Sequence, residues 1–136
     1  MHLNPYLNFN GTCEQAFTFY ERHLGGKIVM LQTFGDTPMA GQMPNMAKKV
    51  VHARITIGDL LVMGSDAPPD NFQPQRGMML ALGVESPAEA DRVFNALADG
   101  GQVRMALQQT FFSQRFGMLV DRFGIPWMIN CDQAAA

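Results

Sequence analysis

Residues Leu7 to Ile28 read LNFNGTCEQAFTFYERHLGGKI, and the same pattern returns 75 residues later from Leu82 to Val103 as LGVESPAEADRVFNALADGGQV. Phe19 matches Phe94, both copies carry a Gly-Gly pair at the same place, and the alignment needs no gap. An internal repeat of this length predicts two similar modules, each too small to bury one of its faces alone.

Each copy contains the start and stop signals of a helix. Thr12 and Ser86 stand three residues before a Gln or Glu, which is the spacing of a capping box at a helix start. Pro87 is expected at the first helical position, where its missing N–H costs nothing. We expect each helix to end at its glycine pair, Gly25-Gly26 or Gly100-Gly101, because glycine readily adopts the left-handed conformation of a helix end.

Strand-like segments surround both helices. Alternation of apolar and polar residues between turn signals predicts strands at residues 3–9, 27–34, 50–57 and 60–65, and again at 78–84, 102–109, 115–120 and 125–131. Gly58-Asp59 is predicted to form a tight turn, and residues 121–124 are predicted to form the last turn. Each half therefore reads as strand–helix–strand–strand–strand.

The segments between these elements set the expected domain organisation. Residues 35–49 show no strong period, and residues 67–77, with three prolines, are typical of a linker. We expect one domain over residues 1–136, with module one at 1–66, the linker at 67–77 and module two at 78–132. The fold class is α+β, in which two βαβββ modules form a cupped mixed sheet around a shared cleft, with the helices outside.

Composition excludes several classes of protein. The chain has 136 residues, 47% of them hydrophobic and 16% charged, which is typical of a globular domain rather than a disordered segment. A net charge of −2 provides no basic field for nucleic acid. No segment approaches the ~20 apolar residues of a membrane span, and the first residues do not resemble a signal peptide. Cys13 and Cys131 lack metal or CxxC spacing, so reduced thiols and a cytoplasmic location are expected.

Eleven methionines are many for this length. Methionine is flexible and fills irregular cores or adaptable binding surfaces. We expect most of these side chains in the core, and the alternative is a pocket lined by methionine.

Four segments carry a family resemblance: NPYLNF at residues 4–9, AFTFY at 16–20, MGSD at 63–66 and, most specifically, DRFGIPWMIN at 121–130. Together with the repeat, they resemble PhnB-like proteins of the glyoxalase / bleomycin resistance / dioxygenase superfamily, which has the vicinal oxygen chelate fold. The resemblance covers nearly the whole chain. It implies the fold more firmly than a function, and it implies a homodimer, because relatives commonly pair.

The resemblance also implies where a metal would be held. Enzymes of the superfamily bind a divalent ion through His, Gln or Glu near the start of each module's first strand and on its last strand, and the ion chelates two vicinal substrate oxygens. Strand alternation places Asn4, Met63, Met79 and Met128 at those positions. Three thioethers and a carboxamide are poor ligands for Zn, Ni, Mg or Fe(II). We therefore expect neither a standard metal site nor a cofactor.

The remaining candidate residues follow from the same alternation. His52 is either a hydrogen-bonded strand histidine or a general base or ligand contact, because imidazole titrates near neutral pH. Arg54 either pairs with a carboxylate of the protein or binds a carboxylate or phosphonate ligand. Tyr6 either donates a hydrogen bond to a ligand or caps the sheet. The predicted ligand-cleft residues are Asn4, Tyr6, Asn8, His52, Arg54, Met63, Met79 and Met128.

Three functions follow from this set. The favoured one is a PhnB-like protein that binds a small, partly apolar molecule in the cleft without a standard metal site. The alternative is a metal-dependent lyase, isomerase or dioxygenase of the same superfamily, with an ion held by other residues such as His52 with Asn4. Some PhnB-like domains are labelled as methyltransferases of ubiquinone precursors, but the sequence has no glycine-rich strand-to-helix turn for an adenosyl cofactor. Catalytic residues are not identified.

Overall fold

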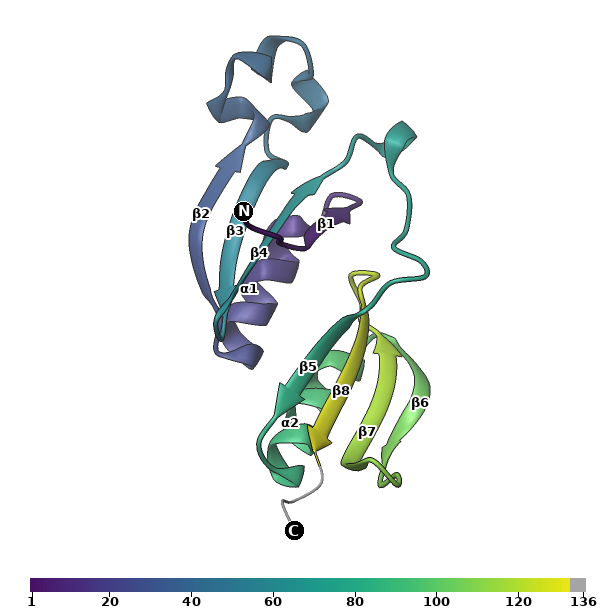
Figure 1. The fold of residues 1–136 in the computed structure, drawn as a ribbon. Helices are drawn as coiled ribbons and strands as arrows, with labels where there is room; N and C mark the ends of the chain where they lie inside the picture. The colour runs from purple at the N-terminus through teal and green to yellow at the C-terminus, as the bar shows by residue number, and fades with distance from the viewer. Residues whose placement is uncertain (133–136) are drawn as a thin grey trace. The chain divides into compact units, whose positions relative to one another are not determined.

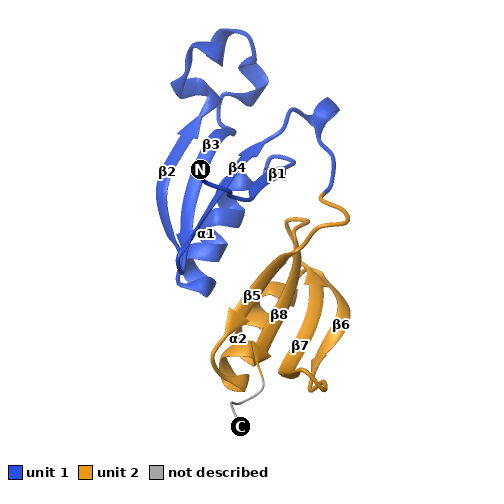
Figure 2. Cartoon of the chain, in the orientation of Figure 1, with its two compact units in different colours: residues 1–74 blue, residues 75–136 orange. Residues whose placement is uncertain are grey.

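The computed structural model describes residues 1–132 and divides the chain into two compact units, Met1–Pro74 and Gln75–Ala136 (Figure 2). The division falls inside the segment 67–77 that the sequence predicts as a linker. The last four residues of the expected 1–136 domain lie outside the described part of the chain.

The first unit contains four strands and one long helix (Figure 1). In chain order these are β1 (Tyr6–Phe9), α1 (Cys13–Leu24), β2 (Lys27–Thr33), β3 (Val50–Ile57) and β4 (Leu60–Asp66). The sheet order is β1-β4-β3-β2, with β1 parallel to β4 and the other pairs antiparallel. Segment 35–49, which has no period in the sequence, contains short 3-10 helices rather than a strand.

The second unit repeats this arrangement. Its elements are β5 (Leu80–Val84), α2 (Pro87–Ala98), β6 (Gln102–Gln108), β7 (Ser113–Val120) and β8 (Pro126–Asp132), and the sheet order β5-β8-β7-β6 is the same. The predicted pair of βαβββ modules is therefore confirmed. Among residues 1–132, no helix has both the length and the apolar character needed to span a membrane.

Alternation along β1 explains how the first core forms. Leu7 and Phe9 are buried toward α1, whereas the alternating residues Tyr6 and Asn8 are exposed. The ring of Phe17 in α1 lies edge-on to Phe9 at a centroid distance of 5.9 Å. The other fully covered apolar residues of this core are Cys13, Ala16, Tyr20, Val50, Ala53 and Ile55. The helix and one face of the sheet thus share a single apolar layer.

The second core forms in the same way from the apolar stripe of α2. Ala90, Val93, Phe94 and Leu97 are buried. The other apolar residues buried in this unit are Leu119 on β7, Ile125 in the turn before β8, and Trp127, Ile129 and Cys131 on β8. The expectation of a methionine-rich core is wrong, because Met46 is the only methionine among the buried apolar residues of the described chain. The branched and aromatic side chains fill both cores and leave the methionines to other surfaces.

Helix capping follows the sequence in α2 but not in α1. The Ser86 hydroxyl accepts a hydrogen bond from the Glu89 N–H at 3.1 Å, as predicted, whereas the Glu89 carboxylate, expected to complete the capping box, accepts from Arg92. Thr12 makes no side-chain cap, so that prediction is wrong; instead the carboxylate of Asp66, distant in the chain, accepts the N–H of Cys13. Gly25 ends α1 at φ +67°, in the left-handed conformation that the glycine pair predicts.

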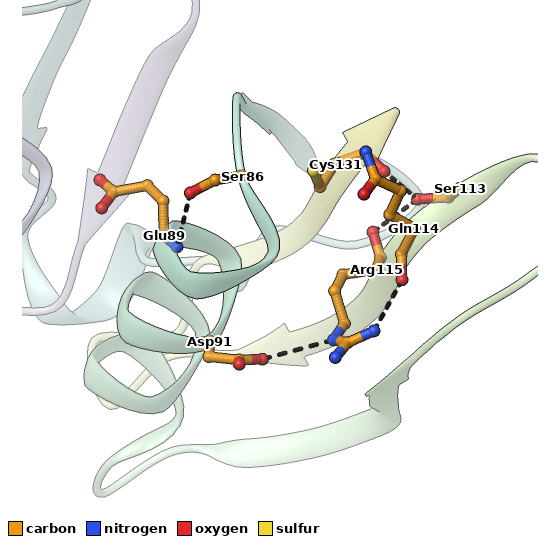
Figure 3. A network of polar contacts seen from close by, with 7 residues as sticks. All are labelled: Ser86, Glu89, Asp91, Ser113, Gln114, Arg115 and Cys131. Carbon is orange, nitrogen blue, oxygen red and sulfur yellow. Dashed lines mark hydrogen bonds and ion pairs between the residues drawn. The ribbon is translucent and has the colours of Figure 1, made fainter. Parts of the chain in front are cut away.

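Polar contacts also connect the elements of the second unit (Figure 3). The Ser113 hydroxyl donates to the carbonyl oxygen of Cys131 at 2.7 Å, which ties the start of β7 to the end of β8. The guanidinium of Arg115 lies 3.6 Å from the carboxylate of Asp91, which links β7 to α2. The last turn has its own polar centre, since Asp121 accepts hydrogen bonds from two backbone N–H groups and from Trp127 Nε1 at 2.9 Å.

Candidate functional site

Each sheet has one face that packs on its helix and one that points away from it, here called the helix-free face. In the first unit, Gly64 points toward α1, because a Cβ placed on it would lie 2.9 Å from Phe17 Cζ. Met63 therefore lies on the helix-free face, and its register partners Tyr6 on β1 and Arg54 on β3 lie on that face with it. His52, two residues before Arg54 on β3, shares this face.

Three of these side chains form a hydrogen-bonded chain. The Tyr6 hydroxyl oxygen lies 3.2 Å from His52 Nδ1, and the two rings stack with an interplanar angle of 25°. The Nε–H of Arg54 donates to His52 Nε2 at 3.1 Å. The imidazole of His52 thus links Tyr6 on β1 to Arg54 on β3.

The direction of these hydrogen bonds follows from donor chemistry. A guanidinium has no acceptor, so His52 Nε2 must accept from Arg54 and carries no proton. A neutral imidazole holds its proton on the other nitrogen, and Nδ1–H therefore donates to the Tyr6 oxygen. The hydroxyl hydrogen of Tyr6 is not used in this chain and remains a donor for another group.

The electrostatic setting keeps His52 neutral. Partial burial is the first cause that lowers the pKa of His52 below its ordinary value, and the positive charge of Arg54 is the second. The charged strand residues on this face are Arg54 and Lys27, which is the register partner of Thr56, and both are positive. The helix-free face of the first sheet is therefore polar and electropositive.

The helix-free face of the second sheet has the same register and a different chemistry. Met128 pairs with Ala81 on β5 and with Met118 on β7, and Met118 pairs with Met105 on β6. By position these residues correspond to Met63, Tyr6, Arg54 and Met30 of the first sheet. Phe116 stands where the first sheet has His52. The tyrosine–histidine–arginine chain is thus replaced by methionine, alanine and phenylalanine.

The other predicted cleft residues are placed as follows. Asn8 lies on β1 on the helix-free face and is exposed. Asn4 precedes β1, and its side-chain amide donates to the carbonyl oxygen of Leu61 at 3.0 Å, which anchors the chain before the strand. Met79 precedes β5 and is 47% exposed. The structure therefore joins Tyr6, His52 and Arg54 directly, with Met63 beside them in register.

The donor set can be tested against the metal that the superfamily implies. Within residues 1–132, no group of three or more His, Cys, Asp or Glu side chains could hold a metal ion. Of the four corresponding positions, three carry thioethers, and only the amide oxygen of Asn4 is a hard ligand atom. Hard and borderline divalent ions require oxygen, nitrogen or thiolate ligands, so these residues do not fit such an ion.

Sequence reasoning missed several residues of these faces. Gln32 is the register partner of His52, but two register shifts in β2 break the alternation that would have revealed it. Phe116 and Met118 were also missed, although their spacing of two matches that of His52 and Arg54 on the equivalent strand.

Comparison with known proteins places the chain among close relatives. A family model described as 3-demethylubiquinone-9 3-methyltransferase matches residues 1–130. Protein YjdN of Escherichia coli (strain K12) is 36% identical over 141 residues, which cover 96% of this chain and 95% of that protein. The crystal structure of protein PA1353 from Pseudomonas aeruginosa superposes with a TM-score of 0.89 at 44% identity, covering 98% and 99% of the two chains. The PhnB protein from Bacillus cereus, which carries the same methyltransferase label, superposes with a TM-score of 0.83 at 28% identity, covering 96% and 99%.

Proposed function

Because this chain belongs to the PhnB-like family, whose model is described as 3-demethylubiquinone-9 3-methyltransferase, we propose that it binds a small, partly apolar molecule on its helix-free sheet faces. The family lies in the glyoxalase / bleomycin resistance / dioxygenase superfamily. Fold membership alone does not fix an activity, so the proposal is argued from the side chains.

One observation carries the proposal: the chain of hydrogen bonds through Tyr6, His52 and Arg54 is preassembled on a sheet face that the helix does not cover. Polar groups held in place before a ligand arrives lose little conformational entropy on binding. A hydroxyl hydrogen and the terminal NH2 groups of a guanidinium are left for the ligand. Such convergent polar groups are typical of small-molecule sites.

The helix-free face of the second sheet, taken by itself, is an apolar surface. Met105, Met118 and Met128 form a row across its helix-free face, with Phe116 beside them. Methionine adapts its shape and contacts aromatic rings favourably. The side-chain oxygen of Asn130 on this face is buried and has no hydrogen-bond partner among the described residues.

The proposal includes binding without a metal held at Asn4, Met63, Met79 and Met128. The thioethers at three of these positions lack the charge and hardness that such ions need. The Asn4 amide contributes instead to holding the segment before β1 against Leu61. No chemical step is assigned to an ion at these positions.

Three further properties belong to the same proposal. We infer one domain over residues 1–136 with modules at 1–66 and 78–132, because a unit of about 60 residues buries only about 60% of its unfolded surface and is marginal alone. A single cooperative unfolding transition would support this, and two separate transitions would contradict it. We also infer a homodimer and a cytoplasmic location, the latter consistent with the free, buried thiols of Cys13 and Cys131.

Binding can be tested on protein that has been treated with a chelator. 2-Naphthoate serves as a small aromatic probe, and its addition is followed in 1H–15N correlation spectra. We expect shifts at residues of a helix-free face, such as His52 and Arg54 on the first sheet, and recovery of the probe unchanged. Shifts confined to α1 and α2, or no shifts at all, would contradict the proposal.

The alternative function is a metal-dependent lyase, isomerase or dioxygenase of the superfamily. It requires an ion held by residues such as His52 with Asn4. Elemental analysis of protein purified without chelator separates the two functions, because a resident catalytic ion should persist near one equivalent, whereas less than roughly a tenth of an equivalent supports metal-free binding.

The methyltransferase description of the family model can be tested separately. Transfer of a methyl group from S-adenosylmethionine to a ubiquinone precursor by this protein would contradict the proposal of binding alone.

A further inference from the structure

We propose that the helix-free face of the first sheet binds an oxyanion of the ligand, such as a carboxylate, with the guanidinium of Arg54 as the charged contact and the hydroxyl of Tyr6 as a donor. This inference rests on the binding function proposed above and names the chemical class that the face selects. His52 is the positioning residue that orients both donors.

The direction of the hydrogen bonds is the first argument. Donation runs from Arg54 to His52 and from His52 to Tyr6, so the tyrosine hydroxyl ends the chain as an unused donor. At the other end, only Nε–H of Arg54 is engaged, and no other described residue accepts from its terminal NH2 groups. Both ends of the chain therefore present donors, which match an acceptor-rich ligand and not a donor.

The charge of the face is the second argument. Arg92, Arg115 and Arg122 each lie within 4 Å of a carboxylate of the protein. Arg54 differs, because its hydrogen-bond partner is a neutral imidazole and no carboxylate in residues 1–132 lies within ion-pair distance of it. A guanidinium that is held in place but not neutralised attracts a planar anion and can bind it through two parallel hydrogen bonds.

The composition of the surrounding strands is the third argument. The neighbours of the chain on this face are uncharged, apart from Lys27. These neighbours are Asn8, Met30, Gln32, Thr56, Met63 and Ser65. An anion placed here would meet two positive charges and no like charge, so its desolvation is offset rather than increased.

The test compares two probes of nearly the same shape, 2-naphthoate and its neutral isostere 2-naphthamide, on the full chain by calorimetry. We expect the wild type to bind the carboxylate more tightly than the amide, by roughly tenfold or more, because hydrogen bonds to an ionised group are about twice as strong as neutral ones. Arg54→Met should remove most of this preference. Tyr6→Phe should weaken carboxylate binding by roughly three- to tenfold, since it deletes one donor.

Lys27→Met is the matched control, because it removes the other positive charge of the same face and leaves the hydrogen bonds among Tyr6, His52 and Arg54 unchanged. We expect less than about a threefold loss from this exposed charge. An equal loss in Lys27→Met and Arg54→Met would overturn the assignment of Arg54 as the contact. The failures are distinguishable: if neither probe binds, the proposed function fails, and if both bind equally, only the oxyanion inference fails.

The positioning role of His52 needs a readout that a folding defect would not produce. His52→Ala should shift the Nε–H resonance of Arg54 in 15N-detected spectra and weaken 2-naphthoate binding. His52→Gln, whose side-chain oxygen can still accept from Arg54, should restore part of the affinity. If His52→Gln binds no better than His52→Ala while both keep a folded spectrum, the positioning role is wrong.

Discussion

The carboxylate of Asp66, at the end of β4, accepts the backbone N–H of Cys13 at the start of α1, with 2.9 Å between Oδ1 and N. Its other oxygen accepts the N–H of Val50 at the start of β3, also at 2.9 Å. Asp66 is only 2% exposed. One buried carboxylate thus connects the first turn of the helix with two strands, and this anion at a helix start is favoured by the helix dipole. The same negative charge is one cause of the raised pKa of Cys13, after burial of the thiol.

Replacing this carboxylate should reduce stability. Asp66→Asn presents an NH2 group to one of two backbone donors, and we expect the free energy of unfolding to fall by about 1–3 kcal/mol, the range for leaving a buried polar group unpaired. Urea denaturation followed by circular dichroism measures the change. Thr12→Ala is the matched control, since Thr12 stands at the cap position but makes no side-chain cap. If Thr12→Ala costs as much as Asp66→Asn, the assignment of the cap to Asp66 is refuted.

Two strand glycines, Gly64 on β4 and Gly83 on β5, should respond differently to alanine. A Cβ on Gly64 would meet Phe17 Cζ at 2.9 Å and the carbonyl oxygen of Leu7 at 3.1 Å, whereas a Cβ on Gly83 would meet nothing within 4 Å. We expect Gly64→Ala to cost about 1–3 kcal/mol, as overpacking of a dense core does. Gly83→Ala should change stability by less than about 0.5 kcal/mol. Thermal unfolding of the two variants tests the difference, and equal effects would contradict the packing of α1 on β4.

The pH dependence of stability follows from the lowered pKa of His52. As pH falls, the unfolded chain takes up this proton at the ordinary value of 6.5, before the folded protein does. The contribution of a neutral His52 is therefore complete above pH 6.5 and is lost as pH falls through the lower, folded pKa. Stability measured between pH 7 and pH 5 should decrease in the wild type, and less so in His52→Gln, which does not titrate.

Arg54 should be responsible for part of that pKa shift. Arg54→Met removes the positive charge that is the second cause of the shift, after burial, so the pKa of His52 should rise. An NMR titration of the His52 ring Cε1–H measures it. Arg22→Met, which removes an equal charge from α1 on the other layer of the unit, is the control and should leave the titration of His52 unchanged. No change in Arg54→Met would show that the two side chains are not in contact.

The inferred homodimer is tested by sedimentation. The edge strands β2 and β6 expose Val29 and Val103 to 52% and 48%. Apolar residues on strand edges are costly to leave in water and favour association. We expect sedimentation velocity at micromolar concentration to give a mass near twice 15.0 kDa. A species of the monomer mass across that range would refute the dimer.

The sequence alone determined the order of elements, because the relevant physics is local. Alternation gave the extent of β3 without error, and the glycine at Gly25 marked the end of α1 through its left-handed backbone. The internal repeat predicted that both units have the same topology, because the same pattern of apolar residues buries the same face of each helix and sheet. Alternation also placed Tyr6 and Asn8 on the face away from α1.

Only the folded chain revealed the contacts between residues distant in sequence. The cap of α1 comes from Asp66, 53 positions away from Cys13, where the local pattern at Thr12 indicated a hydroxyl. The position of Gln32 on the helix-free face could not be predicted, because a bulge in β2 changes which residues of the strand face the helix. The joining of Tyr6 to His52, 46 positions apart, depends on strand pairing that no local pattern encodes. Local preferences therefore determine which elements form, whereas long-range strand pairing determines which side chains come into contact. The candidate site depends on such long-range contacts.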